Sequence, residues 1–202
     1  MIKKIIKLLL GTKNHNARIV AQEKANSLLR TEKKSDIGRW ENATELFTDW
    51  NERTAILGNY ILPNSDIIEF GAGNMFLKTF LSNYKSYTPS DIIKRSDETI
   101  VCDLNTEINI DFSKYQVAVF SGVLEYVYDI NRVFEIISKD INQVVISYCC
   151  TDLVQLSREK NGWLSDYTKS DLEEIFTRHG FKIANYTEWR KQSLFNLIRN
   201  NQ

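Results

Sequence analysis

The spacing of hydrophobic residues along this chain changes once, close to Pro63. Before Pro63, mostly apolar residues recur every three or four positions, which is the spacing of one face of a helix. They form two sets: Ile2, Ile5, Ile6 and Leu9, and then Trp40, Ala43, Phe47, Trp50, Thr54, Leu57 and Ile61. We therefore predict a basic amphipathic helix over residues 1–10, a helix-permissive stretch over 15–29, a loop over 30–36 and a second long helix over 40–60.

After Pro63, short apolar runs alternate with helical segments. The runs that predict strands cover residues 66–70, 86–90, 99–102, 116–121, 143–148, 181–186 and 193–198, and the helices between them cover 75–82, 130–139 and 169–179. This alternation predicts an α/β fold with a doubly wound, mostly parallel sheet of seven strands, because strands that run the same way need crossover helices. Residues 187–192 are too few for a crossover, so the last two strands should form an antiparallel C-terminal hairpin at one edge.

Charge is distributed unevenly although the formal net charge is zero. The first 40 residues carry ten Lys or Arg and three acids, a balance of +7, which leaves −7 for the rest. A chain without a broadly basic surface is not expected to bind nucleic acid. The basic segment 1–10 is predicted to contact a membrane surface, a second subunit or its own acidic domain.

The three cysteines, Cys102, Cys149 and Cys150, have neither the spacing of metal ligands nor that of a disulfide framework. We therefore expect no metal site. Lys7 interrupts the apolar part of the first ten residues, and no cleavage site of small residues follows it, so a secretory signal is not expected. The expected location is the cytoplasm.

A glycine-rich turn follows the first predicted strand. Glu69 closes the strand, and Gly71-Ala72-Gly73-Asn74 leads into a helical segment. Glycines let the backbone approach a ligand closely, and the following helix directs N–H groups at it, so this stretch predicts a nucleotide pocket. A dinucleotide site needs a third glycine at position 76, which is Phe76, although Asp91 meets the spacing of the ribose-binding acid.

Four motifs in chain order resemble those of class I S-adenosylmethionine-dependent methyltransferases. They are Ile67-Ile68-Glu69-Phe70-Gly71-Ala72-Gly73-Asn74, Tyr87-Thr88-Pro89-Ser90-Asp91-Ile92, Val101-Cys102-Asp103-Leu104-Asn105 and the stretch from Val117 to Val127. In the first motif, Met75 replaces the family's usual third glycine. The stretch from Gly162-Trp163 to Gly180-Phe181 is similar to the family's segment between the fifth and sixth strands. The resemblance covers about residues 53–198 and implies a Rossmann-like fold.

The resemblance also implies roles for particular residues. Asp91 would bind the ribose hydroxyls, Asp103 would accept from the adenine amino group, and Leu104 would pack on the adenine ring. The residues expected around the cofactor are Glu69, Gly71, Ala72, Gly73, Asp91, Asp103, Leu104, Ser121, Gly122, Val123 and Arg53. For Asp91 a helix N-cap, for Asp103 a turn and for Arg53 an exposed helix face are the structural alternatives.

The acceptor side of the site is less well defined by the sequence. Trp40, Trp50 and Tyr148 are candidates for contact with the acceptor, and Glu125 and Tyr126 are the best placed candidates for a general base. We expect residues 1–62 to form a helical arm and lid, and residues 63–202 to form the S-adenosylmethionine-binding domain.

The expected function is methyl transfer from S-adenosylmethionine to a small molecule, with a sugar or a lipid-linked metabolite as candidates. An NAD-type oxidoreductase and a non-catalytic S-adenosylmethionine-binding regulatory subunit remain as alternatives.

Overall fold

The computed structural model describes residues 2–42 and 46–200, with side chains described from residue 17 onwards. Its helices are α1 (Ile2–Glu32), α2 (Ile37–Glu41), α3 (Asn51–Gly58), α4 (Phe76–Phe80), α5 (Ile130–Ile137), α6 (Arg158–Asn161) and α7 (Lys169–Arg178). Short 3-10 helices are η2 (Thr48–Trp50), η3 (Phe112–Lys114) and η4 (Leu124–Tyr126).

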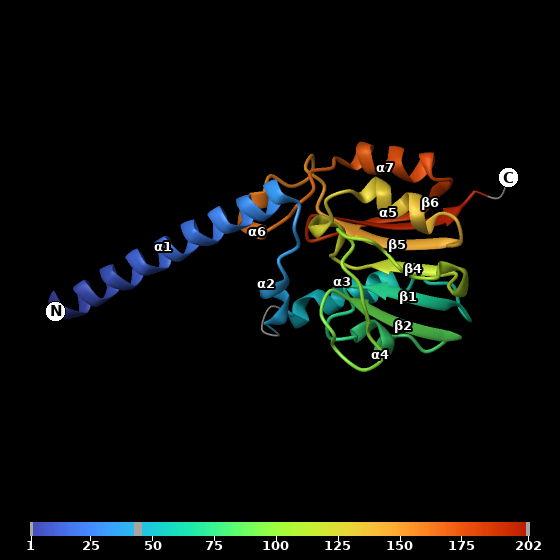
Figure 1. Ribbon diagram of the computed structural model, residues 1–202, viewed down its shortest axis with the longest axis horizontal. Helices are drawn as coiled ribbons and strands as arrows, with labels where there is room; N and C mark the ends of the chain where they lie inside the picture. Colours follow the sequence, from blue (N-terminus) through green and yellow to red (C-terminus); the bar gives the residue numbers. More distant parts are fainter. Residues whose placement is uncertain (1, 43–45, 201–202) are drawn as a thin grey trace.

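Seven strands form one sheet at the centre of the molecule (Figure 1). They are β1 (Asp66–Phe70), β2 (Ser86–Asp91), β3 (Ile100–Val101), β4 (Val117–Phe120), β5 (Gln143–Tyr148), β6 (Phe181–Trp189) and β7 (Gln192–Arg199), in the order β3-β2-β1-β4-β5-β7-β6. The first five strands are parallel, and β7 runs antiparallel to both β5 and β6. The predicted α/β fold with an antiparallel hairpin at one edge is confirmed, and β1 and β5 have the predicted bounds.

Two apolar layers hold helices on opposite faces of this sheet (Figure 1). Ile68 and Phe120 point to the layer that contains α5 and α7, whereas Ile67 and Val119 point to the layer that contains α3 and α4. β1, β4 and β5 are buried along their whole length. Such strands have apolar residues on both faces, which is why they are nearly continuous hydrophobic runs in the sequence.

The N-terminal part differs from the sequence expectation. The predicted long helix over residues 40–60 is wrong, because the chain forms α2, then η2, then α3, and residues 43–45 lie outside the described part. Asp36 caps α2 by accepting from the Arg39 N–H at 3.0 Å, and Phe47 is extended (φ −74°, ψ 127°), so no continuous helix can form. In contrast, α1 is one helix that begins at Ile2, within the predicted segment 1–10, and continues to Glu32, into the expected loop, while residue 1 lies outside the described part.

Candidate functional site

A pocket lies at the carboxyl ends of β1, β2 and β4, beneath the N-terminal helices. Its floor comes from the segments that follow β1, β2, β3 and β4, and its cover from α1, α2, η2 and the residues near them. The strand order reverses at β1, which pairs with β2 on one side and β4 on the other. A doubly wound sheet binds ligands at such a reversal point.

The glycine turn after β1 has the backbone conformation that its sequence requires. Gly71 and Gly73 have φ values of +63° and +50°, and a Cβ at Gly71 would overlap the side chain of Val123. Met75 also lies in the left-handed region, with φ +55°, immediately before α4. The chain therefore keeps this conformation at the position where the methyltransferase motif has its third glycine, although Met75 carries a Cβ.

Asp91 ends β2 and faces the glycine turn. Its Oδ2 accepts from the Gly73 N–H at 2.9 Å, and its Oδ1 accepts from the Ile93 N–H at 3.0 Å. The Arg95 Nε lies 3.5 Å from Oδ2, and the carboxyl group is 5% exposed. Each carboxylate oxygen can accept a further hydrogen bond, so this buried anion can bind two hydroxyl groups at the pocket surface.

Asp103 lies after β3 and contacts the N-terminal segment. Its Oδ1 accepts from Ser35 Oγ at 2.7 Å and from the Asn105 N–H at 2.9 Å. No described group donates to its Oδ2, which leaves that oxygen able to accept from a ligand amino group. Leu104 lines the same part of the pocket and is buried.

Glu69, at the end of β1, is 3% exposed and lines the pocket floor. Tyr87 donates its hydroxyl hydrogen to Glu69 Oε2. Burial raises the pKa of Glu69 to about 8, with a smaller contribution from Asp91, whereas the Tyr87 hydrogen bond and Arg53 act in the opposite direction. A cationic group bound in the pocket would stabilise the ionised form of this carboxyl group.

Arg53 comes from α3 and is 5% exposed, so it is not an exposed helix-face arginine. It donates to Ser121 Oγ through Nε at 3.2 Å, to the Ser121 carbonyl at 3.1 Å and to Gln192 Oε1 at 3.0 Å. A Cβ at Gly122 would overlap the guanidinium group. Burial lowers the pKa of Arg53, but a guanidinium remains charged at neutral pH, so the pocket holds a fixed cation.

Glu125, a candidate general base, and Tyr148, a candidate for contact with the acceptor, are not among the described residues that line the pocket. Glu125 accepts from the Cys149 N–H at 2.9 Å, and its Oε2 is buried without a hydrogen-bond partner. Tyr148 is fully buried, and its hydroxyl contacts Ser165 Oγ at 2.9 Å and accepts from Arg158 at 3.0 Å. The structure therefore does not bring these two side chains to the acceptor region.

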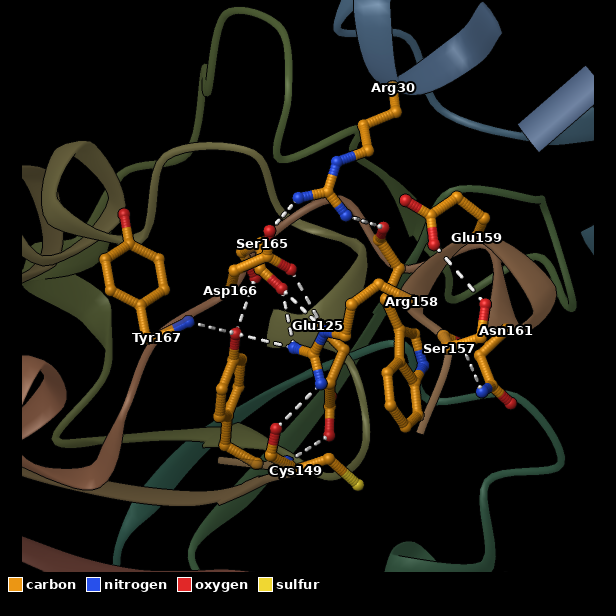
Figure 2. Close-up of polar contacts among 12 residues, drawn as sticks. Arg30, Glu125, Cys149, Ser157, Arg158, Glu159, Asn161, Ser165, Asp166 and Tyr167 are labelled. Atoms are coloured by element: carbon orange, nitrogen blue, oxygen red, sulfur yellow. Dashed lines mark hydrogen bonds and ion pairs between the residues drawn. The ribbon is translucent and has the colours of Figure 1, made fainter. Parts of the chain in front are cut away.

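Arg158 organises the segment between β5 and α7 (Figure 2). Its guanidinium donates to the carbonyl groups of Cys149 and Ser165, at 2.9 Å and 2.6 Å, and lies 3.2 Å from Asp166 Oδ1. Arg30 of α1 pairs with the same Asp166 and donates to the Trp163 carbonyl at 3.2 Å. The C-terminal end of α1 is therefore fixed to this segment.

The cover of the pocket contains the other predicted acceptor residues. Trp40 and Trp50 line the pocket, as does Tyr126, whose ring meets that of Trp40 edge to face at 5.0 Å. Arg95 donates to the Trp40 carbonyl at 2.8 Å, which joins the cover to the segment after β2. Sequence reasoning missed Ser35, Arg95 and Gln192, which contact Asp103, Asp91 and Arg53 respectively.

No protein-family model matches the sequence, and no curated protein matches it. The structure does match many solved methyltransferases. The 1,6-didemethyltoxoflavin-N1-methyltransferase of Burkholderia thailandensis, with S-adenosylhomocysteine bound, has a TM-score of 0.60 and 12% identity over 89% of this chain and 91% of that chain. The N-methyltransferase NodS of Bradyrhizobium japonicum, also with S-adenosylhomocysteine, has a TM-score of 0.55 and 16% identity over 75% of this chain and 87% of that chain.

These matches show that the chain has the fold of class I S-adenosylmethionine-dependent methyltransferases. The motif resemblance is confirmed at the level of the fold, because the sheet order and the terminal hairpin are those of this class.

Proposed function

We propose that the chain is an S-adenosylmethionine-dependent methyltransferase that acts on a small molecule. The observation that carries the proposal is the order of charged groups along one pocket, which follows the strand order β3-β2-β1-β4. Asp103 follows β3, Asp91 ends β2, Glu69 belongs to β1, and Arg53 contacts Ser121 after β4. This order matches an adenine amino group, ribose hydroxyls, an ammonium group and a carboxylate. A dinucleotide would place its diphosphate at the turn after β1, where Phe76 replaces the third glycine.

Each group has a distinct role in this proposal. Asp91 binds the ribose hydroxyls, and Asp103 Oδ2 accepts from the adenine amino group while Leu104 packs on the ring. Glu69 binds the ammonium group, and Arg53 binds the carboxylate. The backbone of Gly71, Ala72, Gly73, Ser121, Gly122 and Val123 shapes the pocket between these side chains.

S-adenosylmethionine supplies an activated methyl group on its sulfonium when bound. Methyl displacement depends mainly on in-line positioning of the acceptor, so the residues of the cover, rather than a strong base, are expected to decide the reaction. Trp40, Trp50 and Tyr126 would contact the acceptor. Burial raises the pKa of Tyr126, so its hydroxyl remains neutral and can donate a hydrogen bond. We assign residues 1–62 to the arm and lid, and 63–202 to the cofactor-binding domain.

One matched structure supports a small acceptor, because the Burkholderia thailandensis enzyme contains bound 1,6-didemethyltoxoflavin beside S-adenosylhomocysteine. A sugar or a lipid-linked metabolite remains our proposal for this chain. A regulatory subunit that binds the same cofactor without catalysis uses the same pocket and is the alternative.

Calorimetric titration of the intact protein with S-adenosylhomocysteine, NAD and ATP tests the cofactor. We expect S-adenosylhomocysteine to bind with micromolar or tighter affinity and the other two to bind far more weakly. Tight binding of NAD without binding of S-adenosylhomocysteine would favour the oxidoreductase. Binding of S-adenosylhomocysteine without methylation of any acceptor would favour the regulatory alternative.

The affinity for S-adenosylhomocysteine should increase with pH up to about 8. Glu69 has a pKa of about 8 in the free protein, so ionising it below this pH costs free energy, which the ligand ammonium group must offset. Binding should therefore release a proton between about pH 6 and pH 8. Calorimetry in buffers of different ionisation enthalpy measures that proton, and Glu69→Gln should remove the pH dependence. Equal slopes for the two proteins would contradict this role of Glu69.

The same raised pKa makes the unliganded fold sensitive to pH. In the unfolded chain Glu69 has the ordinary glutamate pKa of 4.5, whereas in the folded chain its pKa is about 8. The contribution of this group to stability is therefore complete below pH 4.5 and is lost as the pH rises through about 8.

Gln192→Ala should weaken binding only of ligands that carry the amino-acid carboxylate. Gln192 accepts a hydrogen bond from one guanidinium nitrogen of Arg53, so removing the Gln192 side chain leaves the guanidinium less well oriented. We expect roughly a fivefold to tenfold loss for S-adenosylhomocysteine, corresponding to about one hydrogen bond. Methylthioadenosine, which lacks the carboxylate, serves as the control ligand and should bind both proteins equally. An equal loss for both ligands would instead indicate a general structural defect.

A further inference from the structure

Helix α1 extends away from the rest of the molecule (Figure 1). At 31 residues it is about 46 Å long. Within the part of α1 whose side chains are described, residues near its C-terminal end are fixed to the body: Asn26 donates to the Glu159 carbonyl at 2.5 Å, Glu23 pairs with Lys160 at 3.4 Å, and Arg30 pairs with Asp166. Residues 17–22, which precede these contacts, are all exposed.

The extended part of α1 contains basic residues and no acidic ones. Residues 2–22 contain Lys3, Lys4, Lys7, Lys13 and Arg18 and no acid, a charge of +5. The spacing of Ile2, Ile5, Ile6 and Leu9 in the sequence is that of one helical face. Val20 belongs to the same face, because it follows Leu9 by eleven residues, about three turns. Val20 is 63% exposed. A basic helix with an apolar face is typical of helices that lie on membrane surfaces.

We propose that α1 binds the surface of an anionic lipid bilayer. The lysines match the negative charge of the lipid headgroups, and the apolar face can enter the boundary with the acyl chains. A second copy of α1 is a poor partner, because two helices of charge +5 repel each other. The chain's own acidic domain is not the partner either, since the extended part points away from it (Figure 1).

The helix would lie on the membrane and not span it. In the described residues, no helix is long and apolar enough to cross a bilayer. Asn26 and Leu29, near the fixed end of α1, line the candidate site. Membrane binding would therefore hold the cover of the pocket close to the lipid surface, where an amphipathic or lipid-linked acceptor is presented. This last step rests on the proposed function, whereas binding to lipid does not.

Sedimentation with vesicles tests the proposal on the full chain. We expect binding to vesicles of phosphatidylcholine mixed with phosphatidylglycerol, weakened by high salt, and little binding to phosphatidylcholine alone. The triple variant Lys3→Glu, Lys4→Glu, Lys7→Glu should lose on the order of 100-fold in partitioning, because each basic residue near the surface contributes severalfold. The matched control Lys114→Glu, Lys139→Glu, Lys182→Glu makes the same charge change at exposed positions of the body and should retain binding.

Two results would overturn the proposal. One is equal binding of both triple variants, which would show that general charge and not α1 is responsible. The other is absence of vesicle binding together with a dimer in solution that the α1 variant dissociates, which would assign the helix to a second copy. Titration of the same α1 variant with S-adenosylhomocysteine separates this inference from the proposed function, because the cofactor affinity should be unchanged.

Discussion

Asp91→Ala is expected to lower the affinity for S-adenosylhomocysteine by at least about 100-fold. The carboxylate can accept one hydrogen bond from each ribose hydroxyl, and hydrogen bonds to a charged group contribute about 1.5–3 kcal/mol each. The group is also buried and positions the Gly73 N–H, so its loss disturbs the glycine turn that faces the ligand. Calorimetry measures the affinity, and Asp91→Asn should cause a smaller loss because it keeps one acceptor oxygen.

Asp97→Ala is the matched control for this experiment. Like Asp91→Ala, it removes one aspartate carboxylate, here from a position six residues later in the chain. The side chain of Asp97 is fully exposed and pairs with Lys94 at 3.0 Å. We expect its cofactor affinity and thermal unfolding temperature to equal those of the natural sequence. If Asp91→Ala binds S-adenosylhomocysteine as tightly as Asp97→Ala does, the assignment of the pocket is wrong.

The fold could be predicted because its hydrophobic pattern has a direct structural cause. A strand buried on both faces is a nearly continuous apolar run, and the predicted bounds of β1 and β5 agree with the structure. The hairpin followed from chain length alone, since six residues between two strands cannot hold a crossover helix. The prediction of one helix over residues 40–60 was wrong because Trp40 and Trp50 have helical spacing in the sequence but belong to separate elements, α2 and η2. Both side chains line the pocket.

The residues of the candidate site that topology predicts most directly lie at or just after strand ends. Asp91 ends β2 and Asp103 lies two residues after β3, so their position at the carboxyl edge of the sheet was fixed by topology. Gln192 meets Arg53 across 139 residues, and Ser35 meets Asp103 across 68, contacts that no local pattern encodes. Tyr148 has the right position at a strand end, but its side chain points to Arg158 instead of the pocket.

Arg158→Leu should lower the free energy of unfolding by about 3–5 kcal/mol, the usual cost of removing one member of a buried polar network. Arg158 is 8% exposed, and its guanidinium donates to the carbonyl groups of Cys149 and Ser165 (Figure 2). It also donates to the Tyr148 hydroxyl. Without the guanidinium, buried carbonyl groups lose their donor. Burial raises the pKa of Glu125, and this carboxyl group loses one of the two arginines that oppose that rise. Urea denaturation measures the change, and limited proteolysis should show earlier cleavage within residues 149–166.

The structure offers Arg178→Leu as the matched control for Arg158→Leu, because Arg178 is an exposed arginine of α7 that pairs with Glu174. An exposed ion pair contributes little, so we expect a change within about 0.5 kcal/mol. Arg158→Lys keeps the charge but cannot reach all of the acceptors. Its decrease in the free energy of unfolding should lie between the decreases of the two leucine variants. Equal stability of Arg158→Leu and Arg178→Leu would mean that the segment after β5 is held by its apolar contacts.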